Sequence, residues 1–217
     1  MIYSAVKWII DKLAVIITIP LIAPALIIIA LLIKLTSPGP IFYRGERVGK
    51  GGRTFRMFKF RSMVLDAEFK GGFSTANNDP RLTIIGKKIR RYKLDELPQL
   101  FNVFLGDMTL VGPRPQVRFY TDKYSSKESQ ILDVRPGITD LASLYFSDMD
   151  SYLGDGNIDS KYELEVEPIK NRLRLFYVKQ RSLYLDFQIL MKTIFKLAGL
   201  EKLADVNPLI QKLNVSG

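Results

Sequence analysis

The sequence contains no cysteine and no histidine. Without cysteine, disulfide bonds and thiolate metal sites are excluded, and without histidine, histidine zinc sites are excluded. The two absences together exclude a catalytic nucleophile of the Ser-His or Cys-His type. Any base or nucleophile must therefore be Asp, Glu, Lys, Tyr or a hydroxyl. A required metal would be a hard cation such as magnesium, held by carboxylates and phosphate oxygens.

Negative charge is also scarce relative to positive charge. The 217 residues include 32 Lys and Arg against 22 Asp and Glu, which gives a formal net charge of +10. Such a balance indicates an anionic partner, which is nucleic acid, an anionic membrane leaflet or a phosphorylated substrate. Charge alone does not choose among the three. The hydrophobic share of 47% is enough for one ordinary core, but it is concentrated at the N-terminus.

The N-terminal apolar run, Leu13 to Ile33, has no charged residue and is long enough to cross a hydrocarbon core. Pro20 and Pro24 fall in its middle, where each removes a backbone donor and favours a kink. Lysines also flank both ends, and the positive-inside tendency would hold both ends on the cytoplasmic side. We therefore favour a re-entrant helix over a single-span anchor, and both over a cleaved signal peptide.

The soluble part begins after the Pro- and Gly-rich stretch Thr36 to Pro40. Ile41 to Val48 and Thr54 to Phe60 carry β-forming residues, and the glycines of residues 49–52 between them predict a turn. This pattern predicts a short hairpin. Ser62 is a candidate cap for a short helix that would run through Glu68.

Three later stretches have helical patterns. Ile84 to Tyr92 is amphipathic with a basic face, and Gln99 to Leu105 is bounded by Pro98 and by a natural stop at Gly106. In residues 162–200 aromatic and basic residues are mixed, which suits either a membrane interface or an ordinary amphipathic core helix. The predicted fold class is α+β, mainly helical, with three regions: a kinked re-entrant membrane helix at 1–35, a catalytic domain at 36–200 and a C-terminal tail at 201–217.

Asp95 and Glu96 follow directly after the basic stretch Lys87 to Lys93. Cations next to a carboxylate pair offset the repulsion between an anionic side chain and an anionic phosphate, so the pattern suits phosphate chemistry with an aspartate nucleophile. The dipole and free N–H groups of the following helix would favour both Asp95 and a bound phosphate. Asp95 as a simple N-cap explains the same local pattern equally well.

Seven short motifs, read together, resemble the bacterial sugar transferase family of monotopic phosphoglycosyl transferases. They occur in family order and at family-like spacing from the N-terminal helix to Thr139, and each is weak alone. They are Ser37-Pro38-Gly39-Pro40, Phe58-Lys59-Phe60-Arg61-Ser62-Met63, Asp79-Pro80-Arg81, Leu94-Asp95-Glu96-Leu97-Pro98-Gln99, Gly106-Asp107-Met108, Val111-Gly112-Pro113-Arg114-Pro115 and Arg135-Pro136-Gly137-Ile138-Thr139.

The resemblance implies transfer of a phosphosugar from a UDP-sugar to polyprenol phosphate, with release of UMP, at the start of glycoconjugate or polysaccharide assembly. Asp95 matches the nucleophile of the family, and Glu96 matches its partner, which would organise Mg²⁺ together with Asp95. The matching phosphate contacts are Lys59, Arg90 and Arg114, with Arg61 as a weaker candidate. The implied location is the cytoplasmic face of the bacterial inner membrane, among membrane lipids and without nucleic acid. Oligomeric state, a homodimer included, is left open.

Two departures from the family pattern concern the membrane helix and the chain after Thr139. The family bends its helix at a Ser-Pro pair, whereas this chain has Ala23-Pro24, so only the proline of the predicted kink is kept. Where many relatives continue with Gly, this chain has Asp140, and no arginine occurs between Arg135 and Arg172. Asp148 and Asp150 add acidity there, which suggests a different recognition of the donor sugar.

Two other functions compete with a transferase. A membrane-anchored basic protein that binds nucleic acid or anionic lipid would use the basic hairpin and helix, but it leaves the Asp-Glu pair unexplained. A membrane phosphatase would use Asp95 as nucleophile and water as the final acceptor.

Overall fold

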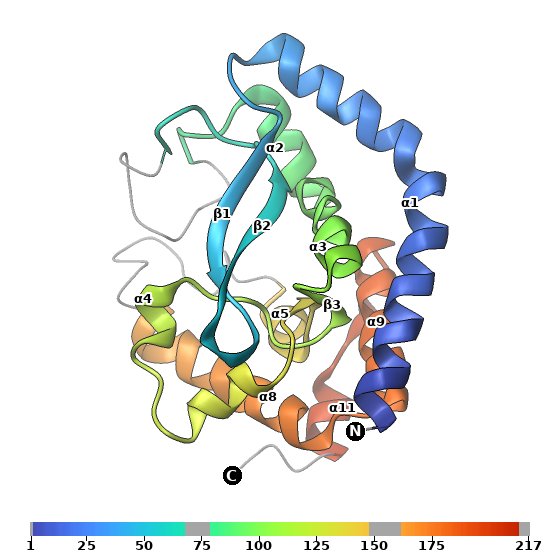
Figure 1. Cartoon of the computed structure of the whole chain (residues 1–217), viewed down its shortest axis with the longest axis vertical. Coiled ribbons are helices and arrows are strands. Elements are labelled where there is room, and N and C mark those ends of the chain that lie inside the picture. Colours follow the sequence, from blue (N-terminus) through green and yellow to red (C-terminus); the bar gives the residue numbers. More distant parts are fainter. Residues whose placement is uncertain (1, 68–78, 148–161, 213–217) are drawn as a thin grey trace.

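The computed structural model describes residues 2–67, 79–147 and 162–212, and its fold is mainly helical with two small sheets (Figure 1). The α+β class predicted from the sequence is confirmed. The described helices are α1 (Ile2–Thr36), α2 (Ile84–Arg91), α3 (Gln99–Leu105), α4 (Arg118–Thr121), α5 (Leu141–Tyr145), α8 (Glu167–Gln180), α9 (Leu183–Leu197), α10 (Glu201–Ala204) and α11 (Asn207–Lys212). Shorter turns are η1 (Lys50–Gly52), η3 (Leu94–Glu96), η4 (Glu128–Asp133) and the π-helical η5 (Tyr162–Val166).

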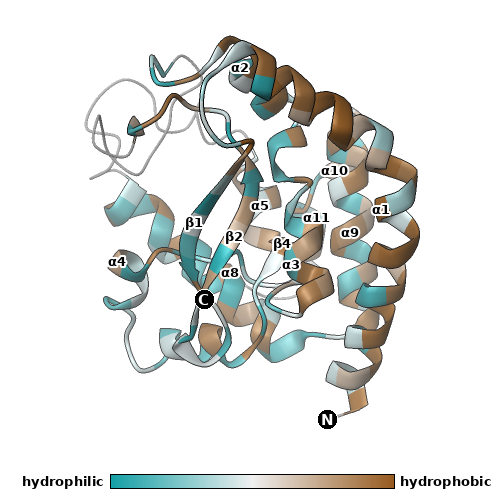
Figure 2. Ribbon diagram, turned by 45° about the horizontal axis from the view of Figure 1, so that its top comes forward, coloured by the Kyte–Doolittle hydropathy of each residue, from teal (hydrophilic) through white to brown (hydrophobic). Residues whose placement is uncertain are grey.

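Helix α1 is continuous through Pro20 and Pro24, and it is the one described helix that is long and apolar enough to cross a membrane. It follows a curved course along one side of the molecule and over its top in Figure 1. Its outer face is apolar, as the brown colouring in Figure 2 shows. Large exposed side chains on it include Ile9, Leu13, Ile17, Leu21, Ile28, Leu31 and Leu35.

The inner face of α1 packs against the rest of the protein along both halves of the helix. In the first half, Val15 is buried with Met57, Val103 and Met108. In the second half, Ile29 and Ile33 are buried with Phe60 and Ile89. Polar contacts continue this packing to the N-terminus, where the ammonium of Lys7 lies 2.9 Å from Asp186 of α9. Helix α1 therefore packs against the rest of the protein near its N-terminus and along both halves.

The predicted hairpin is confirmed. Strands β1 (Phe42–Val48) and β2 (Thr54–Phe60) pair antiparallel, with Phe42 opposite Phe60 and Val48 opposite Thr54. The turn uses Gly51 and Gly52, whose φ angles of 67° and 74° favour glycine. In Figure 1 the hairpin occupies the middle of the view, and α3 lies between β2 and α1.

Helix α2 is confirmed, but the predicted helix from Ser62 is wrong over the described residues. Instead, Met63 forms an isolated bridge with Leu82, and the Thr83 N–H donates to the Ser62 carbonyl at 3.0 Å. A Cβ added to Gly86 of α2 would lie 1.8 Å from that same carbonyl oxygen. The bare backbone of Gly86 thus lets α2 press directly on residue 62, and this tertiary contact overrides the local helix signal. Glu68 and most of the predicted loop from Lys70 lie outside the described residues.

A second sheet, which the sequence patterns do not predict, joins two of the family-like motifs. Strands β3 (Thr109–Val111) and β4 (Gly137–Thr139) are parallel, with Thr109 opposite Gly137 and Val111 opposite Thr139. A Cβ on Gly137 would lie 2.1 Å from the Gly112 nitrogen, so glycine at 137 allows the two segments to approach. Each strand is too short to give a periodic signal.

The larger core lies between α5, α8, α9 and the C-terminal helices. Its buried residues include Leu141, Leu173, Tyr177, Ile189, Val206 and Leu209. The helical pattern predicted for residues 162–200 is observed as η5, α8 and α9, with a break where the Ser182 side chain accepts from the Leu185 N–H and caps α9. Val206 and Leu209 belong to the predicted C-terminal tail, residues 201–217, and both are buried in this core.

Candidate active site

The Asp95–Glu96 pair lies in the turn η3, immediately before α3. The chain enters this turn through Lys93, a non-glycine residue in the left-handed region with φ 56°. Such a conformation costs on the order of 1 kcal/mol and is found disproportionately at functional sites. The N-cap position of α3 is Pro98, and no side chain caps it. Asp95 therefore does not serve as the N-cap of α3.

Glu96 is held by two cations that come from separate parts of the chain. The Lys59 ammonium of β2 donates to Glu96 Oε1 at 2.8 Å, and the guanidinium of Arg114 donates to the same oxygen. Burial acts to raise the pKa of Glu96, but Arg114 and Lys59 outweigh it and hold the pKa well below its ordinary value. These two cations therefore favour the anionic form of Glu96.

Asp95 has the opposite environment. Its side chain is buried, at 5% exposed, and its carboxylate has no hydrogen-bond or ion-pair partner among the described residues. Burial raises the pKa of Asp95, and the neighbouring charge of Glu96 raises it further, while Lys59, Arg90 and Lys93 act against the rise. Two adjacent carboxylates with pKa values pushed apart are typical of groups that play different chemical roles.

Lys59 is positioned by the side chain of Asn102, which is fully buried in α3. The Phe58 N–H donates to Asn102 Oδ1 at 2.8 Å, and Asn102 Nδ2 donates to the Arg56 carbonyl at 3.0 Å. One amide thereby ties β2 to α3 directly before Lys59. Burial lowers the pKa of Lys59, and the ion pair with Glu96 opposes this effect.

Arg114 follows β3 and is positioned by the segment around β4. Its Nη1 donates to the Ile138 carbonyl at 2.8 Å, and its backbone N–H donates to Asp140 Oδ2 at 2.9 Å. The Gly137 N–H also donates to the Pro113 carbonyl at 3.0 Å. Burial acts to lower the pKa of Arg114, but the carboxylates around it raise the pKa overall. Arg114 is therefore charged when it meets Glu96.

The other sequence-predicted residues lie in different surroundings. Arg90 acts electrostatically on Asp95 and has no carboxylate within ion-pair distance among the described residues. Arg61 is buried, and its guanidinium donates to the carbonyls of Ser37 and Pro38, where the chain leaves α1. Pro24 lies inside α1. The structure thus brings together Asp95, Glu96, Lys59 and Arg114, with Arg90 nearby, and gives Arg61 hydrogen bonds elsewhere.

Three residues near the pair are not in the sequence-predicted set: Lys93, Asn102 and Asp140. Lys93, a basic residue two positions before Asp95, and Asp140, which stands where many relatives have Gly, are both visible in the sequence. Asn102 has no such signal, because its role depends on β2 lying against α3. Asp148 and Asp150, the other acidic candidates of the divergent loop, lie outside the described residues.

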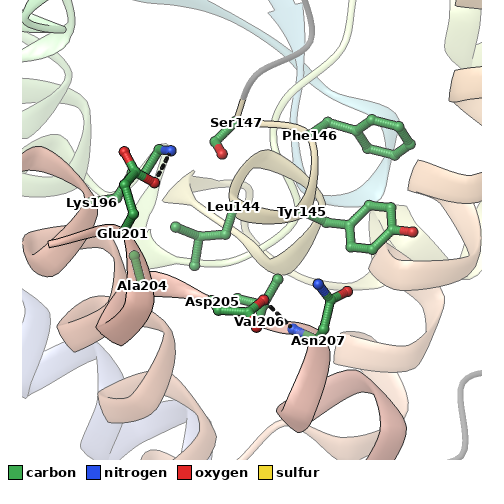
Figure 3. Close-up of a pocket in the computed structure, with 10 residues that line it drawn as sticks. All are labelled: Leu144, Tyr145, Phe146, Ser147, Lys196, Glu201, Ala204, Asp205, Val206 and Asn207. Carbon is green, nitrogen blue, oxygen red and sulfur yellow. Dashed lines mark hydrogen bonds and ion pairs between the residues drawn. The ribbon is translucent and has the colours of Figure 1, made fainter. Parts of the chain in front are cut away.

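A cavity of about 500 Å³ lies between the end of α5 and the C-terminal helices. Figure 3 shows it flanked by the ion pair of Lys196 with Glu201 and by the hydrogen bond between Asp205 and Asn207. None of the sequence-predicted site residues lines it. The cavity is therefore separate from the Asp95–Glu96 pair.

The donors available to a metal at the pair are few. Among the described residues no three acidic side chains gather into a metal-binding group. Asp95 has no partner in the part of the chain that the structure describes, and both cations on Glu96 contact Oε1. Magnesium is commonly bound through one or two carboxylates together with substrate phosphates and water. Asp95 and Glu96 fit a magnesium ion of this kind, and they do not form an all-protein cage.

Comparisons with known proteins agree with the motifs. The family model described as bacterial sugar transferase matches residues 2–199. A UDP-N-acetylgalactosamine-undecaprenyl-phosphate N-acetylgalactosaminephosphotransferase of Aeromonas hydrophila is 41% identical over 196 residues, which cover 89% of this chain and 44% of that protein.

UDP-glucose:undecaprenyl-phosphate glucose-1-phosphate transferases are also similar. The Escherichia coli (strain K12) protein is 38% identical over 81% of this chain and 36% of its own length. The Caulobacter vibrioides protein is 34% identical over 87% of this chain and 68% of its own length. The chain thus spans less than half of two of these three relatives.

Proposed function

Because the chain belongs to the bacterial sugar transferase family, we propose that it transfers a sugar 1-phosphate from a UDP-sugar to polyprenol phosphate. The observation that carries this proposal is the buried side chain of Asp95, which has no hydrogen-bond or ion-pair partner among the described residues and lies next in sequence to Glu96. Lys59 and Arg114 hold Glu96 in place. The names of the relatives support a UDP-sugar as donor and a polyprenol phosphate as acceptor. Because these names specify different sugars, the donor sugar of this chain stays open.

In the first step a carboxylate oxygen of Asp95 attacks the sugar-linked phosphorus. The bond from this phosphorus to the oxygen bridging the two phosphates breaks, UMP leaves, and an aspartyl phosphosugar remains. A carboxylate that accepts no hydrogen bond from the described residues suits this attack, because none of these residues must be displaced first. In the second step an oxygen of polyprenol phosphate attacks the same phosphorus, the bond to Asp95 breaks, and the free carboxylate returns.

The cations around the pair would stabilise the charge on the transferred phosphoryl group. Arg114 can bind two phosphate oxygens at once, whereas Lys59 acts as a point charge. Arg90 has no carboxylate partner among the described residues, which leaves its charge available for a phosphate. A magnesium ion held by Asp95 and Glu96 would supply further neutralisation of phosphate charge when bound.

Glu96 keeps Lys59 and Arg114 in position and affects the titration of Asp95. We expect Glu96→Gln to slow UMP release and to move the acid limb of its pH profile to lower pH. The sign follows because loss of the Glu96 charge removes a repulsion that raises the pKa of Asp95 and leaves Lys59 free to lower it. Single-turnover UMP release measured across the acid range checks this. An acid limb that stays in place or moves upward contradicts it, and Glu46→Gln, an exposed carboxylate on β1, is the matched control.

The reaction is tested with purified protein, Mg²⁺, polyprenol phosphate and a panel of UDP-sugars, with UMP and lipid product measured together. We expect UMP release with at least one donor, together with an equal amount of lipid-linked sugar phosphate, and loss of both when EDTA removes Mg²⁺. No UMP from any donor contradicts the proposed reaction. Continuous UMP release without polyprenol phosphate indicates hydrolysis, as in a phosphatase, and contradicts transfer.

We further propose that α1 is a re-entrant helix whose two ends face the same side of the membrane. Both halves of its inner face pack on the domain while its outer face is apolar. A straight crossing would draw the packed domain, with its charged residues, into the hydrocarbon core, at high cost. Shallow insertion exposes only the outer face of α1 to lipid, and it places the Asp95–Glu96 pair near the phosphate of a membrane-held acceptor.

Topology can be tested cleanly because the chain has no cysteine of its own. Single cysteines at Ile2 and Leu35, which are exposed at the two ends of α1, would be treated with a membrane-impermeant maleimide. We expect both to react in inverted inner-membrane vesicles and neither to react in spheroplasts. Reaction of one end from each side would reject re-entrance.

A further inference from the structure

Asp140 is a buried carboxylate that the proposed chemistry does not use. It is 1% exposed and accepts two backbone hydrogen bonds. The Ser143 N–H donates to Oδ1 at 2.7 Å, which caps α5, and the Arg114 N–H donates to Oδ2 at 2.9 Å. One oxygen therefore serves the fold of α5, and the other contacts a residue of the candidate active site.

In the segment Pro113-Arg114-Pro115, only the backbone N–H of Arg114 can donate a hydrogen bond, and Asp140 accepts it. Pro113 and Pro115 have no N–H group, so Arg114 carries the one amide hydrogen of these three residues. The guanidinium of Arg114 is held by the Ile138 carbonyl, which lies two residues before Asp140. The same stretch of chain thus holds Arg114 at its backbone and at its side chain, and this directs the second guanidinium nitrogen to Glu96.

Asp140 is in turn held by buried charges of α8. Arg174, 2% exposed, places its Nε 3.9 Å from Asp140 Oδ2, and its Nη1 donates to Glu167 at 2.7 Å. Nη1 also donates to Asn171 at 2.8 Å, whereas Nε has no hydrogen-bond partner among the described residues. Burying three charges is costly unless their geometry is well defined. This cluster therefore forms a rigid support behind Arg114.

We propose that Asp140 is a positioning residue, which acts through Arg114 and does not touch substrate. Its Oδ2 fixes the backbone of Arg114, so that the guanidinium reaches Glu96 and the transferred phosphate in one orientation. The proposal rests on the function proposed above. It replaces the expectation that the acidity at this position serves recognition of the donor sugar.

The variant Asp140→Asn separates the two roles of this side chain. Asparagine is as good an N-cap as aspartate, so its oxygen can keep the bond from the Ser143 N–H. The second oxygen becomes an amide NH₂ group, which cannot accept from the Arg114 N–H. The full chain carrying this change is assayed for single-turnover UMP release with the best donor of the panel.

We expect Asp140→Asn to lower the maximal rate about tenfold or more, because a small misplacement of a charged group is costly in catalysis. The UDP-sugar concentration for half-maximal rate should change by less than about twofold, since a positioning defect acts mainly on the reacting complex. In an Arg114→Ala background the same substitution should change the rate by less than about twofold. An equal fall in both backgrounds, or no fall in either, overturns the proposal.

A second measurement does not need turnover. Hydrogen exchange of the Arg114 amide, read from peptides that end at Pro115, should be at least about tenfold faster in Asp140→Asn than in the wild type, as expected when a protecting hydrogen bond is lost. The Ser143 amide should keep its protection. Unchanged exchange at Arg114 overturns the proposal. If the wild type releases no UMP, the proposed function fails, and exchange still decides whether Asp140 holds Arg114.

The matched control is Asp205→Asn at the start of α11. Asp205 is exposed, and its Oδ1 accepts from the Asn207 N–H at 2.9 Å, so the change in charge and side chain is the same. We expect neither the rate of UMP release nor the exchange of the Arg114 amide to change. A fall of both in this control would mean that lost charge alone explains the Asp140 variant, and it would overturn the proposal.

Discussion

Substitution of Asp95 by Asn is expected to abolish UMP release, with a loss of at least about 1,000-fold, as for removal of other enzymatic nucleophiles. The amide keeps the shape of the carboxylate but cannot attack phosphorus. Wild-type protein incubated with Mg²⁺ and the best UDP-sugar, without polyprenol phosphate, should gain the mass of one sugar phosphate, and the variant should not. Intact-protein mass spectrometry and radiolabelled UMP release check both. An Asp95→Asn protein that retains wild-type UMP release would remove Asp95 from the role of nucleophile.

The same substitution is expected to make the protein more stable at neutral pH. Folding raises the pKa of Asp95, so its ionised form is disfavoured in the folded state at pH values above that pKa. Replacing it with a neutral group should raise the melting temperature by about 2–4 °C, if the relief is about 1 kcal/mol. The difference should vanish in acid, once the wild-type carboxyl is protonated in both states. A variant of lower melting temperature at neutral pH would contradict the unpartnered environment of Asp95.

The second large effect is expected at Arg174. Arg174→Ala removes the buried cation that lies within ion-pair distance of both Glu167 and Asp140, and removing one partner of a buried ion pair typically costs about 3–5 kcal/mol. For a chain of this size the melting temperature should fall by roughly 6–20 °C. Thermal unfolding followed by circular dichroism in the same detergent or nanodisc checks this.

Two further variants make the Arg174 result specific. Arg172→Ala lies two positions away on the exposed side of α8 and should change the melting temperature little. Adding Glu167→Gln to Arg174→Ala should recover part of the lost stability, because one of the two buried carboxylates that lost Arg174 is then neutral. If Arg172→Ala and Arg174→Ala are equally destabilising, or if Glu167→Gln adds to the loss, the buried cluster does not contribute as described.

The elements whose signals are local could be predicted from the sequence. The glycines at 49–52 between two β-forming runs predict the hairpin, and Gly106 predicts the end of α3, where it has φ 93°. The helix predicted from Ser62 failed because Gly86 lets α2 pack on that backbone. The β3–β4 pair was missed because three-residue strands far apart in the chain have no periodicity to detect.

In the candidate site, too, some residues could be predicted from local sequence signals and others could not. Asp95, Glu96, Lys59 and Arg114 are found through short motifs, and the ion pairs on Glu96 join three of them. No motif predicts that Asn102 ties β2 to α3 or that Arg174 lies behind Asp140. Both depend on packing between distant segments, and such contacts become visible only when the elements are assembled. Arg61 illustrates the reverse case, because its motif position does not reveal that it binds the carbonyls after α1.

The apolar outer face of α1 has a consequence for how the reaction rate should be expressed. A protein held along this face diffuses in two dimensions and meets its lipid acceptor at a frequency set by surface density. Dilution of the acceptor with inert lipid at constant total amount should therefore slow transfer, whereas dilution of the whole suspension with buffer should leave the acceptor step nearly unchanged. For the proposed transfer, the Michaelis constant for polyprenol phosphate should accordingly be expressed as a mole fraction in the membrane.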